Sequence, residues 1–218
     1  MGKEKVSVVV PVYNAEKTIE LCVSSLLNVD YPKNQLELIF VDNKSTDSTK
    51  KILQRYQDRI ILTSEVKKGP AAARNRGIKI ATGDIIAFTD ADCAVDKDWL
   101  KNMVNYFDRN KVGIIAGKIL PLNPVNKLEE YICSLHNHMR SVQAKMPYAI
   151  TINWASKKSV LLEAGLFDEN FLRSQDTELS FRISRKGYEL IYVPEAIVYH
   201  KDIYTYHGLF RKGYLSGF

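Results

Sequence analysis

The most constraining feature of this sequence is an alternation of short apolar runs with longer helix-like segments across its first two-thirds. The apolar runs cover residues 6–11, 36–41, 60–63, 85–89 and 113–116. Short runs rich in β-branched residues are typical of strands buried on both faces. This alternation predicts an α/β fold with a Rossmann-like, mostly parallel central sheet and helices on both faces.

The segments between these runs carry apolar residues at helical spacing. We expect helices from a cap at Asn14, from a cap at Ser45 or Thr46, over 70–81 and over 99–107. After Pro121 the pattern loosens. There we expect helices over 128–139, 156–164 and 176–186, then strands over 188–193 and 196–199 separated by Pro194.

Composition bounds the organisation of the chain. Its 218 residues carry 31 Lys+Arg against 25 Asp+Glu, a net charge of +6, and no stretch reaches the roughly 18 apolar residues of a membrane span. The three cysteines (Cys22, Cys93, Cys133) form no Cys-x-x-Cys pair, which suits a reducing, cytoplasmic compartment. We expect one domain over 1–218, with parts at 1–118, 119–200 and 201–218.

Two common nucleotide-binding motifs are absent from the sequence. There is no Gly-x-Gly-x-x-Gly, and the segment from Gly113 to Lys118 has three residues between its glycines and Ile119 where a phosphate-binding loop needs Ser or Thr. Instead, acids follow the predicted strands: Asp42 after one, Asp90 and Asp92 after another. Carboxylates at such a sheet edge can hold Mg²⁺ or Mn²⁺ together with substrate phosphates.

Four motifs in order resemble those of a family 2 glycosyltransferase, an inverting, nucleotide-sugar-dependent enzyme with the GT-A fold. The resemblance runs from Val6 to about His200. The motifs are Val6-Ser-Val-Val-Val-Pro-Val-Tyr-Asn14, Val41-Asp42-Asn43-Lys44-Ser45-Thr46-Asp47, Gly69-Pro70 through Arg74-Asn75-Arg76-Gly77, and Asp90-Ala91-Asp92.

The resemblance implies a role for each matching position. It implies nucleotide-sugar contacts from Pro11, Tyr13, Asp42, Asn43, Arg74, Asp90 and Ala91, and a metal ion on Asp92. Asn43 stands where the family usually has a second Asp, and an amide both donates and accepts, so the preferred base stays open.

The second half of the chain supplies the acceptor side. Phe167-Asp168-Glu169, followed by Gln175-Asp176 and Arg182, is similar to the family's Phe-Asp-Glu…Glu-Asp…Arg pattern, which implies Asp176 as catalytic base. Gln175 replaces the usual Glu, so Asp176 loses a charged neighbour. The alternative is that Asp176 is only a cap for the helix that follows.

Three further positions carry expectations. His200 ends a predicted strand and is expected to be a second metal ligand, the alternative being a histidine bonded to backbone. Trp154 is a candidate platform for an acceptor sugar, the alternative being a core residue. His136 and His138 are expected to be surface residues.

The resemblance implies transfer of a sugar from a nucleoside diphosphate sugar, with UDP favoured, to a hydroxyl of a glycan or lipid-linked glycan. It implies a Mn²⁺ or Mg²⁺ cofactor and no nucleic-acid partner. Alternatives are a non-catalytic sugar-nucleotide-binding domain and a nucleotidyltransferase. Aromatic and basic residues in the tail, 201–218, allow peripheral contact with the cytoplasmic face of a membrane, or an ordinary closing helix.

Overall fold

The computed structural model describes residues 4–109, 111–171 and 173–201. Its centre is one eight-stranded sheet in the order β3-β2-β1-β4-β7-β6-β8-β5. The strands are β1 (Val6–Val12), β2 (Leu36–Asp42), β3 (Ile61–Ser64), β4 (Ile85–Phe88), β5 (Cys93–Val95), β6 (Val112–Pro121), β7 (Trp154–Lys157) and β8 (Glu189–His200).

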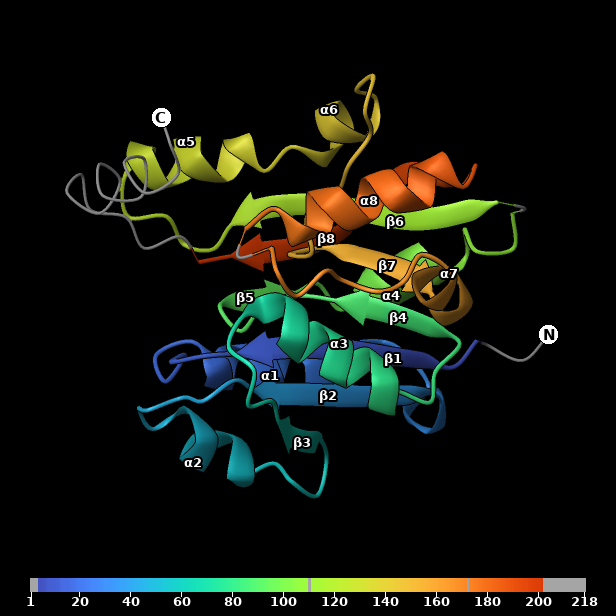
Figure 1. The fold of residues 1–218 in the computed structure, drawn as a ribbon. Coiled ribbons are helices and arrows are strands. Elements are labelled where there is room, and N and C mark those ends of the chain that lie inside the picture. The colour runs from blue at the N-terminus through green and yellow to red at the C-terminus, as the bar shows by residue number, and fades with distance from the viewer. Residues whose placement is uncertain (1–3, 110, 172, 202–218) are drawn as a thin grey trace.

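The sheet is parallel through its first four strands, as the alternation predicts. β2 pairs with β1 and β3, β1 pairs with β4, and β6 pairs with β8, all parallel. The pairs β4–β7, β6–β7 and β5–β8 are antiparallel. Strands from both halves of the chain therefore share one sheet, with β4 and β7 at the junction (Figure 1).

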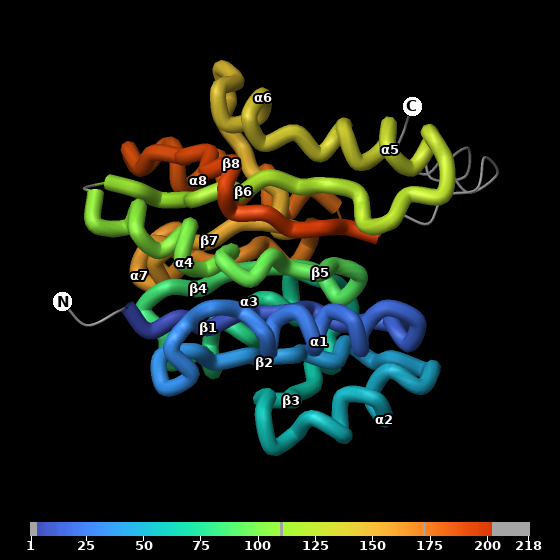
Figure 2. The backbone as a smooth tube through the Cα atoms, turned by 180° about the vertical axis from the view of Figure 1, so that it is seen from behind, coloured from blue at the N-terminus to red at the C-terminus, as the bar shows by residue number. Residues whose placement is uncertain are grey.

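Helices cover both faces of this sheet, as expected. They are α1 (Ile19–Leu27), the 3-10 turn η1 (Lys33–Gln35), α2 (Thr49–Gln54), α3 (Pro70–Ile80), α4 (Trp99–Val104), α5 (Lys127–Leu135), α6 (His138–Val142), α7 (Lys158–Glu163) and α8 (Gln175–Arg185). One core packs α1, α2 and α4 against the sheet, and a second packs α3, α7 and α8 against the other face. Figure 1 shows the second face, and Figure 2 shows the first.

Alternate residues of β1 supply both cores. Val8 and Val10 belong to the first core and Val9 to the second, since successive side chains of a strand point to opposite faces. All three are fully buried. This double burial explains why the run is continuously apolar.

Several boundaries differ from the sequence expectations. Asn14 is no helix cap: α1 begins at Ile19 after Thr18, and Asn14 has a positive φ of 47°. The sequence pattern does not predict β5 or β7: β5 directly follows the Asp-x-Asp motif, and half of β7 falls within the helix predicted over 156–164. The two strands expected around Pro194 are one strand, β8, whose register against β6 shifts between Val193 and Ile197.

Among the described residues, no helix combines the length and apolar character needed to cross a bilayer. The expected membrane contact of the tail falls on residues 202–218, which lie outside the described part of the chain.

Candidate active site

A cavity of about 1280 Å³ opens where β1 and β4 end. This is the edge at which ligands bind to open α/β sheets. Nine of the eleven predicted site residues line it, from both halves of the chain: Pro11, Tyr13, Asn43, Arg74, Asp90, Ala91, Asp92, Asp176 and His200. Asp42 and Trp154 do not.

Two loops form one wall of the cavity. Tyr13, in the loop after β1, lines the cavity and is 53% exposed, so its ring is available to a ligand. The adjacent Asn14 accepts a hydrogen bond from the Thr46 backbone N–H at 2.8 Å, and the Ala15 N–H donates to Thr49 Oγ1 at 2.8 Å. These bonds tie the loop after β1 to the loop after β2.

Asn43 organises a third loop. Its Nδ2 donates to the carbonyls of Glu65 and Lys67 at 2.9 and 2.8 Å, and its Oδ1 accepts from the Gly69 N–H at 2.8 Å. The amide thus closes the segment 65–69, which leads into α3. A carboxylate could not make the two donations, because it only accepts.

The structure does not support a ligand contact for Asp42. Its side chain is buried, lies outside the cavity lining and accepts from the Ser45 N–H at 3.3 Å. The physical reason is that Asp42 is still part of β2, paired with Val12 and Ser64 on its two sides.

Arg74 and Asp90 form an ion pair inside the cavity wall. Arg74 Nη2 lies 2.7 Å from Asp90 Oδ1, and the arginine side chain is only 4% exposed. Nε and Nη1 of Arg74 are buried and have no hydrogen-bond partner among the described residues. Burial raises the pKa of Asp90, with Arg74 acting in the opposite direction. Arg74 thus lies in the wall beside Asp90 with two N–H-bearing nitrogens unpaired among the described residues.

Asp92 and His200 meet at the far side of the same wall. His200 Nε2 lies 3.5 Å from Asp92 Oδ1, and Cys93 Sγ lies 3.7 Å from the same oxygen. Burial opposes ionisation of Asp92, yet its hydrogen bond and charge interaction with His200 outweigh burial, so the pKa of Asp92 lies below its ordinary value.

The ligand atoms of Asp92, Cys93 and His200 lie close enough together to hold a metal ion. One ligand atom from each of Asp92, Cys93 and His200 lies within 4.8 Å of the others. Burial raises the pKa of the Cys93 thiol well above its usual range. A carboxylate and an imidazole that open onto the cavity fit a Mn²⁺-like cation, which takes its remaining ligands from phosphate or water.

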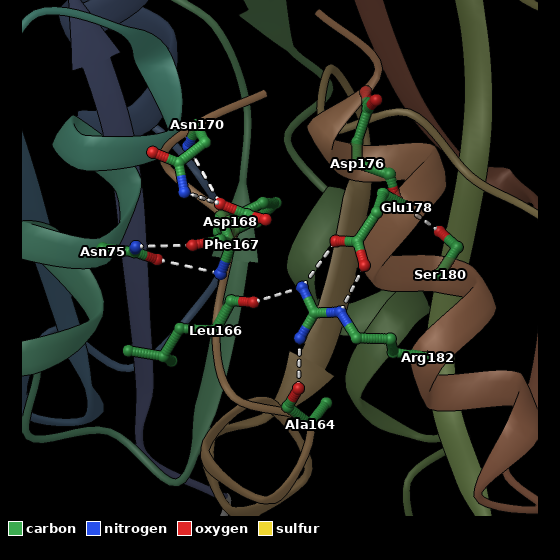
Figure 3. A network of polar contacts seen from close by, with 10 residues as sticks. All are labelled: Asn75, Ala164, Leu166, Phe167, Asp168, Asn170, Asp176, Glu178, Ser180 and Arg182. Atoms are coloured by element: carbon green, nitrogen blue, oxygen red, sulfur yellow. Dashed lines mark hydrogen bonds and ion pairs between the residues drawn. The ribbon is translucent and has the colours of Figure 1, made fainter. Parts of the chain in front are cut away.

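Asp176 also lines the cavity and lies in the first turn of α8 (Figure 3). Its Oδ2 accepts from the Thr151 N–H at 3.3 Å, and both residues line the cavity. The neighbouring Gln175 is buried, and its Oε1 has no hydrogen-bond partner among the described residues. Asp176 is thus a carboxylate in the same cavity as the Arg74–Asp90 ion pair and the Asp92–His200 cluster.

Trp154 corrects the expectation of a sugar platform. It is fully buried in β7, stacked on Phe167 with ring centroids 5.9 Å apart and edge-to-face with Phe88 at 5.8 Å. Both indole faces are therefore enclosed by the second core. The core alternative is correct for this residue.

Two histidines expected on the surface are structural or line the site. His138 is buried, with Nδ1 2.7 Å from the Gly117 carbonyl, and its Nε2 accepts from the Ile150 N–H at 3.0 Å. His136 lines the cavity, and its ring centroid lies 5.6 Å from that of His200. No periodicity marks them, since both lie where the chain passes from α5 to α6.

A Rossmann-like sheet, an Asp-x-Asp turn at its carboxyl edge and a further carboxylate in the same cavity are together typical of the GT-A class of glycosyltransferases. The chain belongs to Glycosyl transferase family 2, whose model matches residues 7–163.

Relatives and solved structures agree with this placement. The chain is 30% identical to glycosyltransferase AglE of Haloferax volcanii over 201 residues, covering 89% of this chain and 66% of that protein. The mannosyltransferase PcManGT of Pyrobaculum calidifontis, solved with GDP-Man and Mn²⁺, superposes with a TM-score of 0.77 at 26% identity, covering 97% of this chain and 61% of the other.

The S. aureus TarS structure over residues 1–349 has the same fold, with a TM-score of 0.74 at 22% identity. It covers 90% of this chain and 60% of that one. The chain spans about two thirds of the length of AglE and 31% of curated Staphylococcus aureus TarS.

Proposed function

We propose that this protein transfers a sugar, with inversion, from a nucleoside diphosphate sugar to an acceptor hydroxyl of a glycan or lipid-linked glycan. One observation carries the proposal: Asp176 lines the same cavity as the Arg74–Asp90 pair and the Asp92–His200 cluster. A direct displacement needs a base on one side of the anomeric carbon and charge stabilisation on the other.

The donor side supports a nucleotide. The Tyr13 ring offers a stacking face for a base, and the Arg74–Asp90 pair lines the same cavity. PcManGT has been solved with GDP-Man and TarS with UDP-GlcNAc, so both UDP and GDP belong in a screen. We favour UDP for this chain.

Asp92 and His200 would hold Mn²⁺ or Mg²⁺. When bound, such an ion neutralises the charge that develops on the leaving diphosphate. Asp90, paired with Arg74, would orient the ribose or the donor sugar from the same wall.

Asp176 takes the proton of the acceptor hydroxyl. The acceptor oxygen forms its bond to the anomeric carbon as the bond from that carbon to the diphosphate breaks. The Thr151 N–H holds the carboxylate of Asp176 in place. No covalent intermediate is needed, so we expect inverted products.

A thermal-shift screen of UDP, GDP, dTDP and CDP with Mn²⁺ tests the donor site. A cognate nucleotide at about 100 times its Kd stabilises a protein by about 2.7 kcal/mol. Donor turnover should then release nucleoside diphosphate. Release of pyrophosphate would indicate nucleotidyl transfer, and nucleotide binding without turnover would indicate a binding domain.

The Asp176→Asn variant tests the base. The amide keeps the shape of the side chain but cannot take the proton, so kcat for transfer should fall about 10²- to 10⁴-fold. The nucleotide-induced thermal shift should be unchanged, because the proposal assigns Asp176 to the acceptor and not to the nucleotide. Full activity in this variant, or retention of the donor's anomeric configuration by NMR of the product, would contradict the mechanism.

A further inference from the structure

The loop between α7 and α8 contacts α3, which carries Arg74, and α8, which carries Asp176. We call residues 164–169 the bridging loop (Figure 3). Gly165 and Leu166 have φ values of 87° and 63°, so two consecutive residues adopt the left-handed region. Leu166 takes this conformation at a steric cost, so contacts elsewhere must hold the loop in place.

Arg182 holds the bridging loop from the side of α8. Its Nε and Nη2 each lie 2.6 Å from an oxygen of Glu178, one turn earlier on the same helix. Nη2 also donates to the Leu166 carbonyl at 2.6 Å, and Nη1 donates to the Ala164 carbonyl. A planar guanidinium has the fixed fork of donors that four such contacts require.

Asn75 holds the same loop from the side of α3. Its Oδ1 accepts from the Phe167 N–H at 3.0 Å, and its Nδ2 donates to the Phe167 carbonyl and to Glu169 Oε1, both at 2.9 Å. The amide is buried and binds both backbone groups of Phe167. Glu169 is also paired with Lys67 at 2.8 Å.

The helices α3 and α8 each carry one residue of the proposed reaction. α3 presents Arg74, whose guanidinium pairs with Asp90 and lies 5.9 Å from the Phe167 ring. α8 presents Asp176. Asn75 and Arg182 themselves are absent from the cavity lining, so any effect they have on a ligand passes through the groups they hold.

From these contacts we infer that Asn75 and Arg182 are positioning residues, which fix the bridging loop as a spacer between α3 and α8 and thereby set the position of Asp176 relative to the Arg74–Asp90 pair. This inference rests on the proposed function. Misplacing a reacting group by about 1 Å can cost about 10²-fold in rate. Loss of stability alone leaves the rate per folded molecule unchanged.

Two variants test this from the two helices. Arg182→Lys keeps the charge but loses the fork, and Asn75→Asp keeps the shape but replaces two donations with repulsion from the Phe167 carbonyl and Glu169. For both we expect kcat per folded molecule to fall about 10- to 100-fold. The donor KM and the UDP- or GDP-induced thermal shift should stay within about twofold.

A rescue and a matched control separate positioning from stability. Adding Glu169→Gln to Asn75→Asp supplies an amide that can donate to the new carboxylate, so part of the lost kcat should return. Ser7→Ala removes a buried hydroxyl, bonded to Glu37 and to the Gly83 N–H, from the opposite end of β1. This control should lose melting temperature and keep its kcat.

An amide signal reports the position of Asp176 without turnover. The Thr151 N–H donates to Asp176, so its cross-peak in a ¹H–¹⁵N spectrum depends on that carboxylate. It should shift in Arg182→Lys and in Asn75→Asp and stay in place in Ser7→Ala. An unmoved cross-peak, or a kcat per folded molecule equal to wild type, would overturn the inference. A wild-type chain that binds no nucleotide and turns over no donor would instead remove the proposed function, and this inference with it.

Discussion

At the scale of single residues, Asn43 shows how an amide in place of the family's usual carboxylate changes the contacts of a side chain. The resemblance placed it among groups that contact the base. In the structure its amide bonds three backbone groups of the segment 65–69, two of them as donor. The side chain therefore shapes the loop that borders the cavity, and Asp42 behind it stays within β2.

The Asn43→Asp variant, which restores the residue usual in the family, should weaken this chain. Both donations are lost, and the carboxylate faces the carbonyls of Glu65 and Lys67. Leaving buried polar groups unsatisfied costs about 1–3 kcal/mol. Urea unfolding should report that loss of stability. Stability equal to wild type would show that the loop holds without the amide.

His138 is a second residue whose chemistry follows from its partners. Burial lowers its pKa from 6.5 to about 4. Nε2 accepts from the Ile150 N–H, so the neutral ring carries its proton on Nδ1, which donates to the Gly117 carbonyl. A proton added on Nε2 would break the bond from Ile150.

The free energy of unfolding should therefore decrease as the pH is lowered below about 6.5. Above that value His138 is neutral in both the folded and the unfolded state. Between about 6.5 and 4 the unfolded chain binds a proton that the folded chain does not. At about 1.36 kcal/mol per pH unit this costs up to about 3 kcal/mol. Urea unfolding from pH 7 to pH 4 should show the slope, and His138→Gln should remove that part of it.

At the scale of elements, the distance between α3 and β1 sets the depth of Arg74. Gly77 is the contact point, since a Cβ there would lie 2.3 Å from Val9 Cγ1. Val9 is itself fully buried. The helix can approach the sheet this closely only without a side chain at Gly77, and Arg74 lies one turn earlier on the same helix.

Gly77→Ala should push α3 outward. Overpacking of a core costs about 1–3 kcal/mol, more than the helix propensity of alanine returns. The free energy of unfolding should fall, and nucleotide binding should weaken as Arg74 moves. Arg76→Ala, at an exposed site on the same helix, is the control. A stabilised Gly77→Ala variant would mean that Val9 can turn aside.

At the scale of the whole molecule, β8 completes the site. It pairs with β6 on one side and β5 on the other, and Cys93 lies directly opposite His200. This pairing brings a histidine from the end of the described chain to an aspartate more than a hundred positions earlier. The predicted Asp92–His200 pair depends on this long-range register.

Removal of the His200 side chain should raise the Mn²⁺ concentration that nucleotide binding requires. Changes to groups that only support a metal ligand cost about 10- to 100-fold in metal affinity, so loss of a ligand in His200→Ala should cost at least about tenfold. EDTA should abolish the nucleotide-induced thermal shift of the wild-type protein. The His200→Ala variant should show a smaller shift, which excess Mn²⁺ should partly restore. An unchanged Mn²⁺ titration would leave Asp92 as the ligand without His200.

The sequence by itself determined the parallel part of the sheet, from β1 to β4, and its carboxyl edge. Short, continuous, β-branched runs favour strands buried on both faces, and polar residues that directly follow such strands lie at their carboxyl ends. Periodicity is local, so it located Asp90, Asp92 and the start of α8 without knowledge of the fold.

Only the tertiary structure decided what each side chain does there. It buried Trp154 between Phe88 and Phe167, kept Asp42 within β2 and drew His138 into the interior. It also paired Asn75 with Phe167, 92 positions away. Such contacts depend on the distance between elements remote in sequence, and no local pattern encodes that distance.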